Sequence, residues 1–428
     1  MSAPKRIPVL VFPCGTEIGL EVARSLRFAP EFELVGASSA VSNHGSYVYR
    51  RYREDMPFVS APGFMDKLNA VIAEEVVGLV FPAHDDATVT LSRRRTEIAA
   101  PLVAPPADTC ALCRSKRDTY AALANYMRVP TLFDNPAGPL PFPVFLKPDR
   151  GQASRGTALV QNREELDYHL RLNPALLTLE YLPGREYTVD CFTDRLGMLR
   201  YVGARERLRI AGGISTDTQL VYRCTELDAM AQAIHRALPM RGAWYFQARE
   251  DASGTPALLE VAARVGGSMG LHRARGVNLP LLAALDALGR DVDVTPRKGP
   301  LRMDRALDCC YAPALSPTRV IVDADSALFL PDGNPNPWMV AFVVQCRNRA
   351  CTVTAVANDP AAMRGRLEQY GLNALVDALD PVPKSWSEDG AKDALLVTGN
   401  PVRRRRALGA GCTVMGPDAI DALLDPRL

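Results

Sequence analysis

The sequence lacks both a long apolar run and an excess of charge of either sign. No stretch of it is long enough to span a bilayer. Lys and Arg total 50 against 48 Asp and Glu, and 47% of the 428 residues are hydrophobic. This balance excludes a broad charged surface for nucleic acid or for a membrane, so any anion site must be local. We expect a globular protein with neither nucleic-acid nor membrane partners.

A cysteine framework and a secretory signal are missing as well. The ten cysteines show no regular spacing, and the one CxxC pair, Cys110 and Cys113, has no second ligand pair at zinc-finger spacing. The apolar run at 7–12 is short and enters Pro13 without a small-residue cleavage site, which favours a first strand over a signal peptide. We therefore expect reduced thiols and a cytoplasmic protein.

A dinucleotide fingerprint is absent from the first hundred residues, although their pattern is that of a parallel sheet. Strand and helix patterns alternate there, at 7–12, 17–27, 32–38 and 76–86. The glycines after the first strand have the wrong spacing, and Ala37 and Ser38 stand where an acid is required. Residues 1–104 are thus predicted to form a Rossmann-like α/β domain that does not bind NAD.

The chain is longer than one hydrophobic core supports, and its pattern predicts two further domains. A proline-rich linker at 101–109 leads into an α+β domain over 105–303. Its expected helices lie at 111–127, 164–172 and 226–238. From 304 to 428, three apolar strands alternate with loops or helices, which predicts a small α/β domain.

A strand that ends in Lys147 runs into a loop with the composition of a phosphate cradle. Glycine permits close approach of the backbone, while a serine hydroxyl and backbone N–H groups donate hydrogen bonds. The residues concerned are Gly151, Ser154, Arg155 and Gly156. The loop is not a Walker A motif, because the lysine precedes the glycines. An ordinary hairpin with a surface lysine remains open on this segment alone.

Two later strands, at 242–247 and 257–268, carry Gln247, Glu260 and Arg264. If these strands pair antiparallel, Gln247 and Glu260 can point the same way and offer oxygen ligands to a hard cation. Nucleotide phosphates would complete the coordination shell of that cation. The alternative for Glu260 and Arg264 is a structural ion pair.

In this order the segments resemble the ATP-grasp superfamily, especially the carboxylate–amine ligases related to carbamoyl-phosphate synthase and the amino-acid ligases. The resemblance covers about 1–290. It implies a pre-ATP-grasp domain followed by an ATP-grasp domain whose two lobes hold ATP and Mg²⁺ between their sheets.

The resemblance also implies a role for each matching residue. Lys116, Lys147 and the loop 151–156 would contact the phosphates, and Glu180, Tyr181, Leu182 and Glu186 would meet adenine and ribose. Gln247 and Glu260 would ligate magnesium, and Arg264 would face the transferred phosphoryl group. One position departs from the family's E-x-N-x-R pattern: Ala262 stands in place of the asparagine and cannot ligate a metal.

The activity implied is the ATP-dependent joining of a carboxylate to an amine through an acyl phosphate, with release of ADP and phosphate. Arg264 would stabilise the developing oxyanion. The substrates are expected to be small molecules, with an amino acid among them, and a homodimer is the default assembly.

Three polar groups near these segments have two interpretations each. Arg205 and Arg207 either bind phosphate or a substrate carboxylate, or lie on a solvated strand face. His272 and Arg275 either reach the acceptor site, or His272 is structural. His84-Asp85-Asp86 follows a strand where α/β sheets place ligands, but an unpaired acidic cap is the favoured interpretation.

Asp323 and Asp325 follow an apolar strand in the last domain. Two carboxylates with this spacing at the end of a strand can serve as a nucleophile and a general acid next to a magnesium ion. Residues 304–428 thereby resemble the haloacid-dehalogenase-like superfamily. The other motifs of the superfamily are weaker here. Thr354 or Asn358 would supply the second motif and Lys384 or Lys392 the third, and Asn400 stands where an acidic magnesium ligand is expected. Because the neutral Asn400 weakens the metal site, we favour a degenerate structural or regulatory domain.

Two rival functions follow from these departures. The last domain could be a working phosphatase, or Ala262 could mark a non-catalytic ATP-binding protein. The basic run 403–406 is interpreted as a solvated helix face rather than an RNA site, since no aromatic platform accompanies it.

Overall fold

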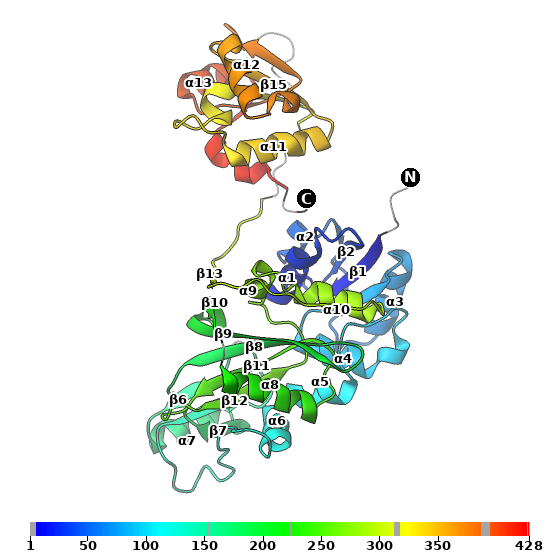
Figure 1. Cartoon of the computed structure of the whole chain (residues 1–428), viewed down its shortest axis with the longest axis vertical. Coiled ribbons are helices and arrows are strands. Elements are labelled where there is room, and N and C mark those ends of the chain that lie inside the picture. Colours follow the sequence, from blue (N-terminus) through cyan, green and yellow to red (C-terminus); the bar gives the residue numbers. More distant parts are fainter. Residues whose placement is uncertain are drawn as a thin grey trace. The chain divides into compact units, whose positions relative to one another are not determined.

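The computed structural model describes residues 6–152, 154–222, 224–311, 317–386, 394–425 and 427. The chain divides into two compact units, Met1–Leu307 and Asp308–Leu428 (Figure 1). Within the described residues, no helix has both the length and the apolar character needed to cross a membrane.

The first unit begins with a four-stranded parallel sheet in the order β3-β2-β1-β4. Its strands are β1 (Ile7–Phe12), β2 (Phe32–Ala37), β3 (Arg51–Arg53) and β4 (Leu79–Pro82), and its helices are α1 (Glu17–Leu26), α2 (Gly45–Val48), α3 (Phe64–Glu74) and α4 (Asp85–Arg93). The predicted βαβ start is confirmed. Phe12 and Pro82 are register partners, so the loops after β1 and β4 emerge side by side.

The helical stretch expected at 111–127 is two helices, α5 (Ala107–Arg114) and α6 (Lys116–Leu123). Ser115 separates them because its backbone is extended, at φ −102° and ψ 123°, and its side chain accepts a hydrogen bond from the N–H of Asp118. Serine in this role caps a new helix instead of continuing the old one. The break places Lys116 at the first position of α6.

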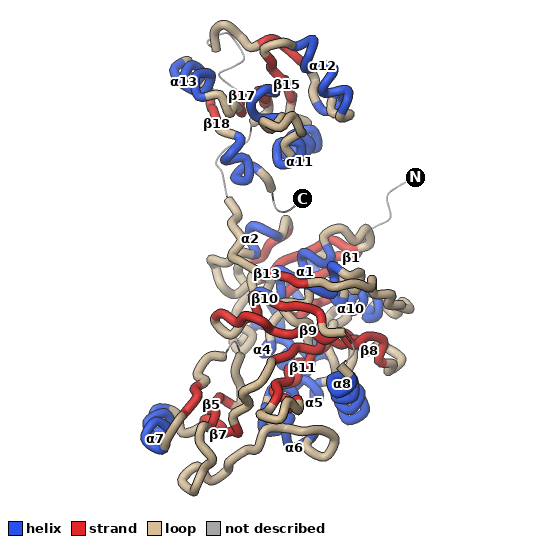
Figure 2. Tube along the Cα trace, turned by 60° about the vertical axis from the view of Figure 1, so that its left-hand side comes forward, coloured by secondary structure: helices blue, strands red, loops and turns tan. Residues whose placement is uncertain are grey.

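A small antiparallel sheet, β6-β5-β7, follows these helices and lies beside α7 (Arg163–Leu172) (Figure 2). Its strands are β5 (Val144–Pro148), β6 (Ala158–Val160) and β7 (Leu176–Glu180). Lys147 lies near the end of β5, opposite Leu177.

The largest sheet has six antiparallel strands in the order β12-β11-β8-β9-β10-β13. They are β8 (Glu186–Thr193), β9 (Leu199–Ala211), β10 (Ile214–Leu220), β11 (Gly242–Glu250), β12 (Pro256–Ala262) and β13 (Arg302–Asp304). Helix α8 (Thr225–Ala237) packs its apolar residues against Trp244 and Phe246. Phe192 and Tyr201 pack in another cluster with α10 (Leu279–Ala287) and α1; the short α9 (Gly270–Ala274) precedes α10.

The second unit is a five-stranded parallel sheet in the order β16-β15-β14-β17-β18. Its strands are β14 (Arg319–Asp323), β15 (Thr352–Ala357), β16 (Ala378–Pro381), β17 (Ala394–Val397) and β18 (Thr413–Met415), and its helices are α11 (Pro337–Asn348), α12 (Pro360–Gln369) and α13 (Pro401–Gly409). The three strands expected in this region, β14, β15 and β17, are confirmed; β14 lies between the other two, and the carboxyl ends of all three meet at one edge of the sheet.

Candidate functional site

A cavity of about 570 Å³ in the first unit is lined by residues of the small and the large antiparallel sheets and by the segments that follow β1 and β4. This volume lies within the usual range for small-molecule sites. The lining includes most of the predicted site residues: Lys116, Lys147, Gly151, Ser154, Arg155, Glu180, Tyr181, Leu182, Glu186, Arg205, Gln247, Glu260 and Arg264. Gly156, His272 and Arg275 are not among the lining residues.

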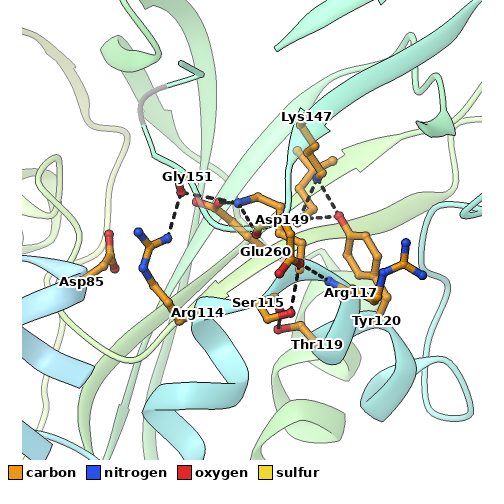
Figure 3. Close-up of polar contacts among 12 residues, drawn as sticks. Asp85, Arg114, Ser115, Arg117, Thr119, Tyr120, Lys147, Asp149, Gly151 and Glu260 are labelled. Carbon is orange, nitrogen blue, oxygen red and sulfur yellow. Dashed lines mark hydrogen bonds and ion pairs between the residues drawn. The ribbon is translucent and has the colours of Figure 1, made fainter. Parts of the chain in front are cut away.

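Lys147 and Lys116 form the cationic end of this cavity. The Lys147 side chain is buried, and its Nζ donates to the Tyr120 hydroxyl at 2.6 Å and to the Leu259 carbonyl at 3.1 Å (Figure 3). Burial, together with the nearby charge of Lys116, lowers the pKa of Lys147 to about 7. Lys147 is therefore not the surface lysine of an ordinary hairpin, and that interpretation is wrong.

The loop after β5 is tied back to the cationic end at its first residues. The Nζ of Lys116 lies 3.4 Å from the carbonyl oxygen of Gly151, and the guanidinium of Arg114 donates to the same oxygen at 3.5 Å. Further on, Ser154 and Gly156 have φ values of +52° and +73°, which turn the backbone sharply. Ala153, inside this loop, lies outside the described residues.

Gln247 and Glu260 are direct register partners on the antiparallel strands β11 and β12, as expected from the sequence. Cross-strand partners share a face, and both side chains line the cavity. An oxygen-rich pair of this kind fits Mg²⁺ whose remaining ligands come from a nucleotide and water. Ala262 lines the same cavity and adds no ligand atom.

The two acids expected at the adenosine end are both paired with arginine. Glu180, at the end of β7, forms an ion pair with Arg128 and accepts a hydrogen bond from the N–H of Thr131 at 3.1 Å. Burial alone would raise the pKa of Glu180, but these partners outweigh it and the pKa is lowered. Glu186 pairs with Arg207, whose side chain is buried.

Arg264 forms a bidentate ion pair with Asp85, the first residue of α4. Burial alone would raise the pKa of Asp85, but the charge and hydrogen bonds of Arg264 more than offset it and lower the pKa. Two sequence interpretations are therefore wrong: Asp85 is not an unpaired cap, and the partner of Arg264 is not Glu260. Glu260 lies instead 3.8 Å from Nζ of Lys116.

Arg205 lines the cavity and belongs to a buried polar network. Its Nε donates to Asp190 at 2.7 Å, and Nε2 of His272 lies 3.1 Å from the same carboxylate. Burial alone would raise the pKa of Asp190, but the charge of Arg205 and the hydrogen bond with His272 outweigh it and lower the pKa to about 2. A solvated strand face is thus the wrong interpretation for Arg205, which is 3% exposed.

His272 is fully buried, and its second ring nitrogen lies 2.8 Å from the Tyr201 hydroxyl, which also accepts from Arg275 at 3.4 Å. Burial lowers the pKa of His272 and favours the neutral ring. These contacts favour the structural interpretation of His272, and neither His272 nor Arg275 lines the cavity.

Sequence reasoning missed the contribution that the segment after β1 makes to this cavity. Thr16 and Glu17 follow β1, and both line the wall. Arg305 pairs with Glu17 and donates to the Ser268 hydroxyl at 2.9 Å, which fastens the segment after β13 to the same wall. The position of Thr16 and Glu17 shortly after β1 could have indicated this contribution, since ligands of α/β sheets bind beyond the carboxyl ends of the strands.

In the second unit, Asp323, Asp325, Asn358 and Asn400 lie together at the carboxyl edge of the sheet. Thr398 donates to Asp323 at 2.6 Å, and the N–H of Asn358 donates to Asp325 at 2.8 Å. Thr354 lies within β15, short of this edge. Lys384 is exposed, and Lys392 lies outside the described residues.

A family model described as "ATP-grasp in the biosynthetic pathway with Ter operon" matches residues 172–308. Three solved structures are similar over comparable lengths. N5-carboxyaminoimidazole synthetase from Staphylococcus aureus complexed with ADP is 13% identical with a TM-score of 0.60, covering 72% of this chain and 84% of its own. The biotin carboxylase domain of 2-oxoglutarate carboxylase from Hydrogenobacter thermophilus, bound to MgADP, ADP and bicarbonate, is 15% identical with a TM-score of 0.57 (68% and 71%). L-amino acid ligase from Bacillus licheniformis is 17% identical with a TM-score of 0.54 (66% and 74%).

No curated protein matches the sequence. The structural likenesses and the family model together establish an ATP-grasp fold.

Proposed function

We propose that this protein is an ATP-dependent carboxylate–amine ligase that forms an amide or peptide bond through an acyl phosphate. The proposal rests on one observation: lysines, oxygen-bearing side chains and an arginine from different parts of the fold line the same cavity. Lys147 reaches it from the small sheet, Gln247 and Glu260 from the large sheet, and the Asp85–Arg264 pair from the boundary with the first sheet. Cations, oxygen ligands and a fixed guanidinium are what phosphoryl transfer from MgATP to a carboxylate requires.

ATP would lie with its adenosine against the turn after β7 and its phosphates against the lysines. Glu180 and the backbone of Tyr181 and Leu182 would meet adenine, and Glu186 the ribose hydroxyls. Lys116, Lys147 and the loop 151–156 would hold the phosphates. Gln247 and Glu260 would hold Mg²⁺, which neutralises charge on the phosphates when bound.

In the reaction, an oxygen of the substrate carboxylate attacks the γ-phosphorus and ADP leaves. The amine then attacks the carbonyl carbon of the acyl phosphate, and phosphate leaves from the tetrahedral intermediate. Arg264 would stabilise the oxyanion, a role supported by Asp85, which holds its guanidinium in one orientation. Exclusion of water by the two lobes protects the acyl phosphate from hydrolysis.

Amino acids are the substrate class that we propose to test first, since one similar structure is an L-amino acid ligase. The proposal includes a pre-ATP-grasp domain at 1–104, an ATP-grasp domain at 105–303, a degenerate haloacid-dehalogenase-like domain at 304–428, and a homodimer. It also includes a cytoplasmic location, with which ten free cysteines are compatible.

The test is a screen for ADP release with amino acids offered singly and in pairs, followed by mass spectrometry of the product. Lys147→Ala should abolish turnover, whereas Lys384→Ala, an exposed lysine of the second unit, should leave it unchanged. ADP release that survives Lys147→Ala would refute the site. ATP binding without ADP release for every carboxylate and amine would instead favour a non-catalytic nucleotide-binding protein, the second rival function, which Ala262 suggests.

A further inference from the structure

The carboxyl edge of the second sheet gathers side-chain oxygens in the manner of a magnesium site. Asp323 ends the central strand β14 and Asp325 follows it, while Asn358 and Asn400 follow the two adjacent strands, β15 and β17. Hard cations bind such carboxylate and amide oxygens, and α/β sheets place ligands at this edge. The resemblance to haloacid-dehalogenase-like proteins implies Mg²⁺ here, and the contacts of these residues test that implication.

The guanidinium of Arg403 lies between the two carboxylates. Its Nη1 is 2.7 Å from Oδ1 of Asp323 and 3.6 Å from Oδ2 of Asp325, and its Nη2 donates to the side-chain oxygen of Asn358. Asp323 is fully buried and the Arg403 side chain is 12% exposed. The interpretation of 403–406 as a solvated face is therefore wrong for Arg403.

Most of the other candidate ligand oxygens already accept hydrogen bonds from the protein. Oδ2 of Asp323 accepts from Thr398 at 2.6 Å, and Oδ2 of Asp325 accepts from the N–H of Asn358 at 2.8 Å. Oδ1 of Asn400 caps α13 and accepts from the N–H groups of Val402 and Arg403 at 3.0 and 3.1 Å. In the part of the chain that the structure describes, no group of three or more His, Cys, Asp or Glu residues is arranged to hold a metal. These residues do not fit Mg²⁺.

The start of α13 explains how the arginine comes to lie there. Asn400 caps the helix and Pro401 occupies its first turn, which fixes Arg403 one turn from the strand ends. A cation in the first turn of a helix is unfavourable next to the positive end of the helix dipole. The buried carboxylate of Asp323 offsets that cost, so the helix end and the aspartate stabilise each other.

We propose that Arg403 is the resident cation of this edge, taking the place that a divalent metal would need, and that the second unit is closed to Mg²⁺ for this reason. An arginine stays charged at every physiological pH and presents donors in a fixed fork, so it neutralises Asp323 without a metal. A second cation a few ångströms away is then repelled. Removing the guanidinium should open a divalent site.

Manganese binding to the full-length, nucleotide-free chain tests the proposal, with electron paramagnetic resonance counting bound Mn²⁺. The variants are Arg403→Met, which removes the charge at similar length, and Arg405→Met, an exposed arginine of the same run. We expect Arg403→Met to bind one more Mn²⁺ per chain than the wild type and Arg405→Met to bind none in addition. Asp323→Asn in the Arg403→Met background should remove the extra ion.

Two outcomes overturn the proposal: wild-type protein that loses a bound Mn²⁺ on Asp323→Asn, and folded Arg403→Met that gains no ion. Circular dichroism establishes whether Arg403→Met folds. If it does not, the wild-type comparison with Asp323→Asn decides, because equal Mn²⁺ binding supports a closed site and unequal binding refutes it. None of these measurements uses ADP release, so the result is independent of the ligase proposal.

Discussion

Asp85 and Arg264 form a bidentate ion pair although 179 positions separate them in the chain, with Nε–Oδ1 and Nη2–Oδ2 distances of 2.6 and 2.7 Å. The pair joins the start of α4, next to the first sheet, to the segment that follows β12. A guanidinium held at two points keeps its remaining donors in a fixed direction, which a transition-state contact requires.

Asp85→Asn should therefore lower kcat for ADP formation by about 100-fold, the cost of losing one well-oriented oxyanion contact. The substitution keeps the shape of the side chain but removes the charge that orients Arg264. Steady-state kinetics with the substrates found in the screen would measure it. Glu97→Gln is the matched control, because Glu97 pairs with Arg94 on the exposed surface of the same domain; a kcat for Asp85→Asn equal to that of this control contradicts the role.

The affinity for ATP should fall as the pH rises through 7. In the proposed site, phosphate would bind the protonated form of Lys147, and burial lowers the pKa of this group to about 7 in the nucleotide-free protein. For a single group with this pKa, affinity should be about tenfold weaker at pH 8 than at pH 6. Calorimetric titration measures the change, and Lys147→Gln corrects for the titration of ATP itself. An identical pH dependence in both proteins would exclude Lys147 as the titrating group.

The same pKa shift predicts the sign of a stability effect. The pKa of Lys147 is lower in the folded protein than its ordinary value of 10.5, so the unfolded chain binds the extra proton between pH 7 and 10.5. Stability contributed by this group should rise with pH across that window, and the rise should be missing in Lys147→Met. Urea unfolding of the nucleotide-free proteins at several pH values measures the difference.

Ala262→Asn should reduce the Mg²⁺ concentration that gives half-maximal ADP release. The new amide oxygen would lie in the cavity near Gln247 and Glu260. One added neutral ligand worth roughly 1 kcal/mol corresponds to about a fivefold reduction. Ala262→Leu, of similar volume but without an oxygen, should show no such gain; equal Mg²⁺ requirements for the two variants would mean that this position lies out of reach of the metal.

His272→Gln should destabilise the protein by about 1 to 3 kcal/mol, because it disrupts the hydrogen bonds of the ring to two buried partners. Asp190 and Tyr201 are those partners. Urea unfolding measures the loss, with His169→Gln on α7 as the surface control. A normal stability combined with a raised KM for the acceptor would restore the acceptor-site role.

The parts of the fold that follow from local pattern could be predicted from the sequence. Helix α1 and its flanking strands alternate within thirty-odd residues, and β11 and β12 are joined by a short connection that brings Gln247 opposite Glu260. The break at Ser115 escaped prediction because serine is tolerated inside a helix as well as at its start, and only the extended backbone distinguishes the two.

Long-range partners could not be predicted in the same way. Nothing near Asp85 in the sequence indicates that Arg264 will neutralise it, and nothing in the run 403–406 indicates that Arg403 alone turns inward to Asp323. Likewise, a histidine in a glycine-containing segment has the same local pattern whether it faces a substrate or, as His272 does, a buried aspartate. Whether such a side chain is buried decides between the two roles, and burial depends on how the sheets pack together in the folded protein.

The bonds from Lys147 to Tyr120 and to the Leu259 carbonyl exist without nucleotide, and they join the small sheet to the large one. A protonated lysine has three donors, so an arriving phosphate would gain a second hydrogen bond from Lys147 only by displacing one of these neutral partners, and that exchange offsets part of its attraction to the lysine. The heat released by ATP in a calorimeter should therefore be smaller than a count of its polar contacts suggests. Tyr120→Phe, which removes one competing partner, should make that heat larger.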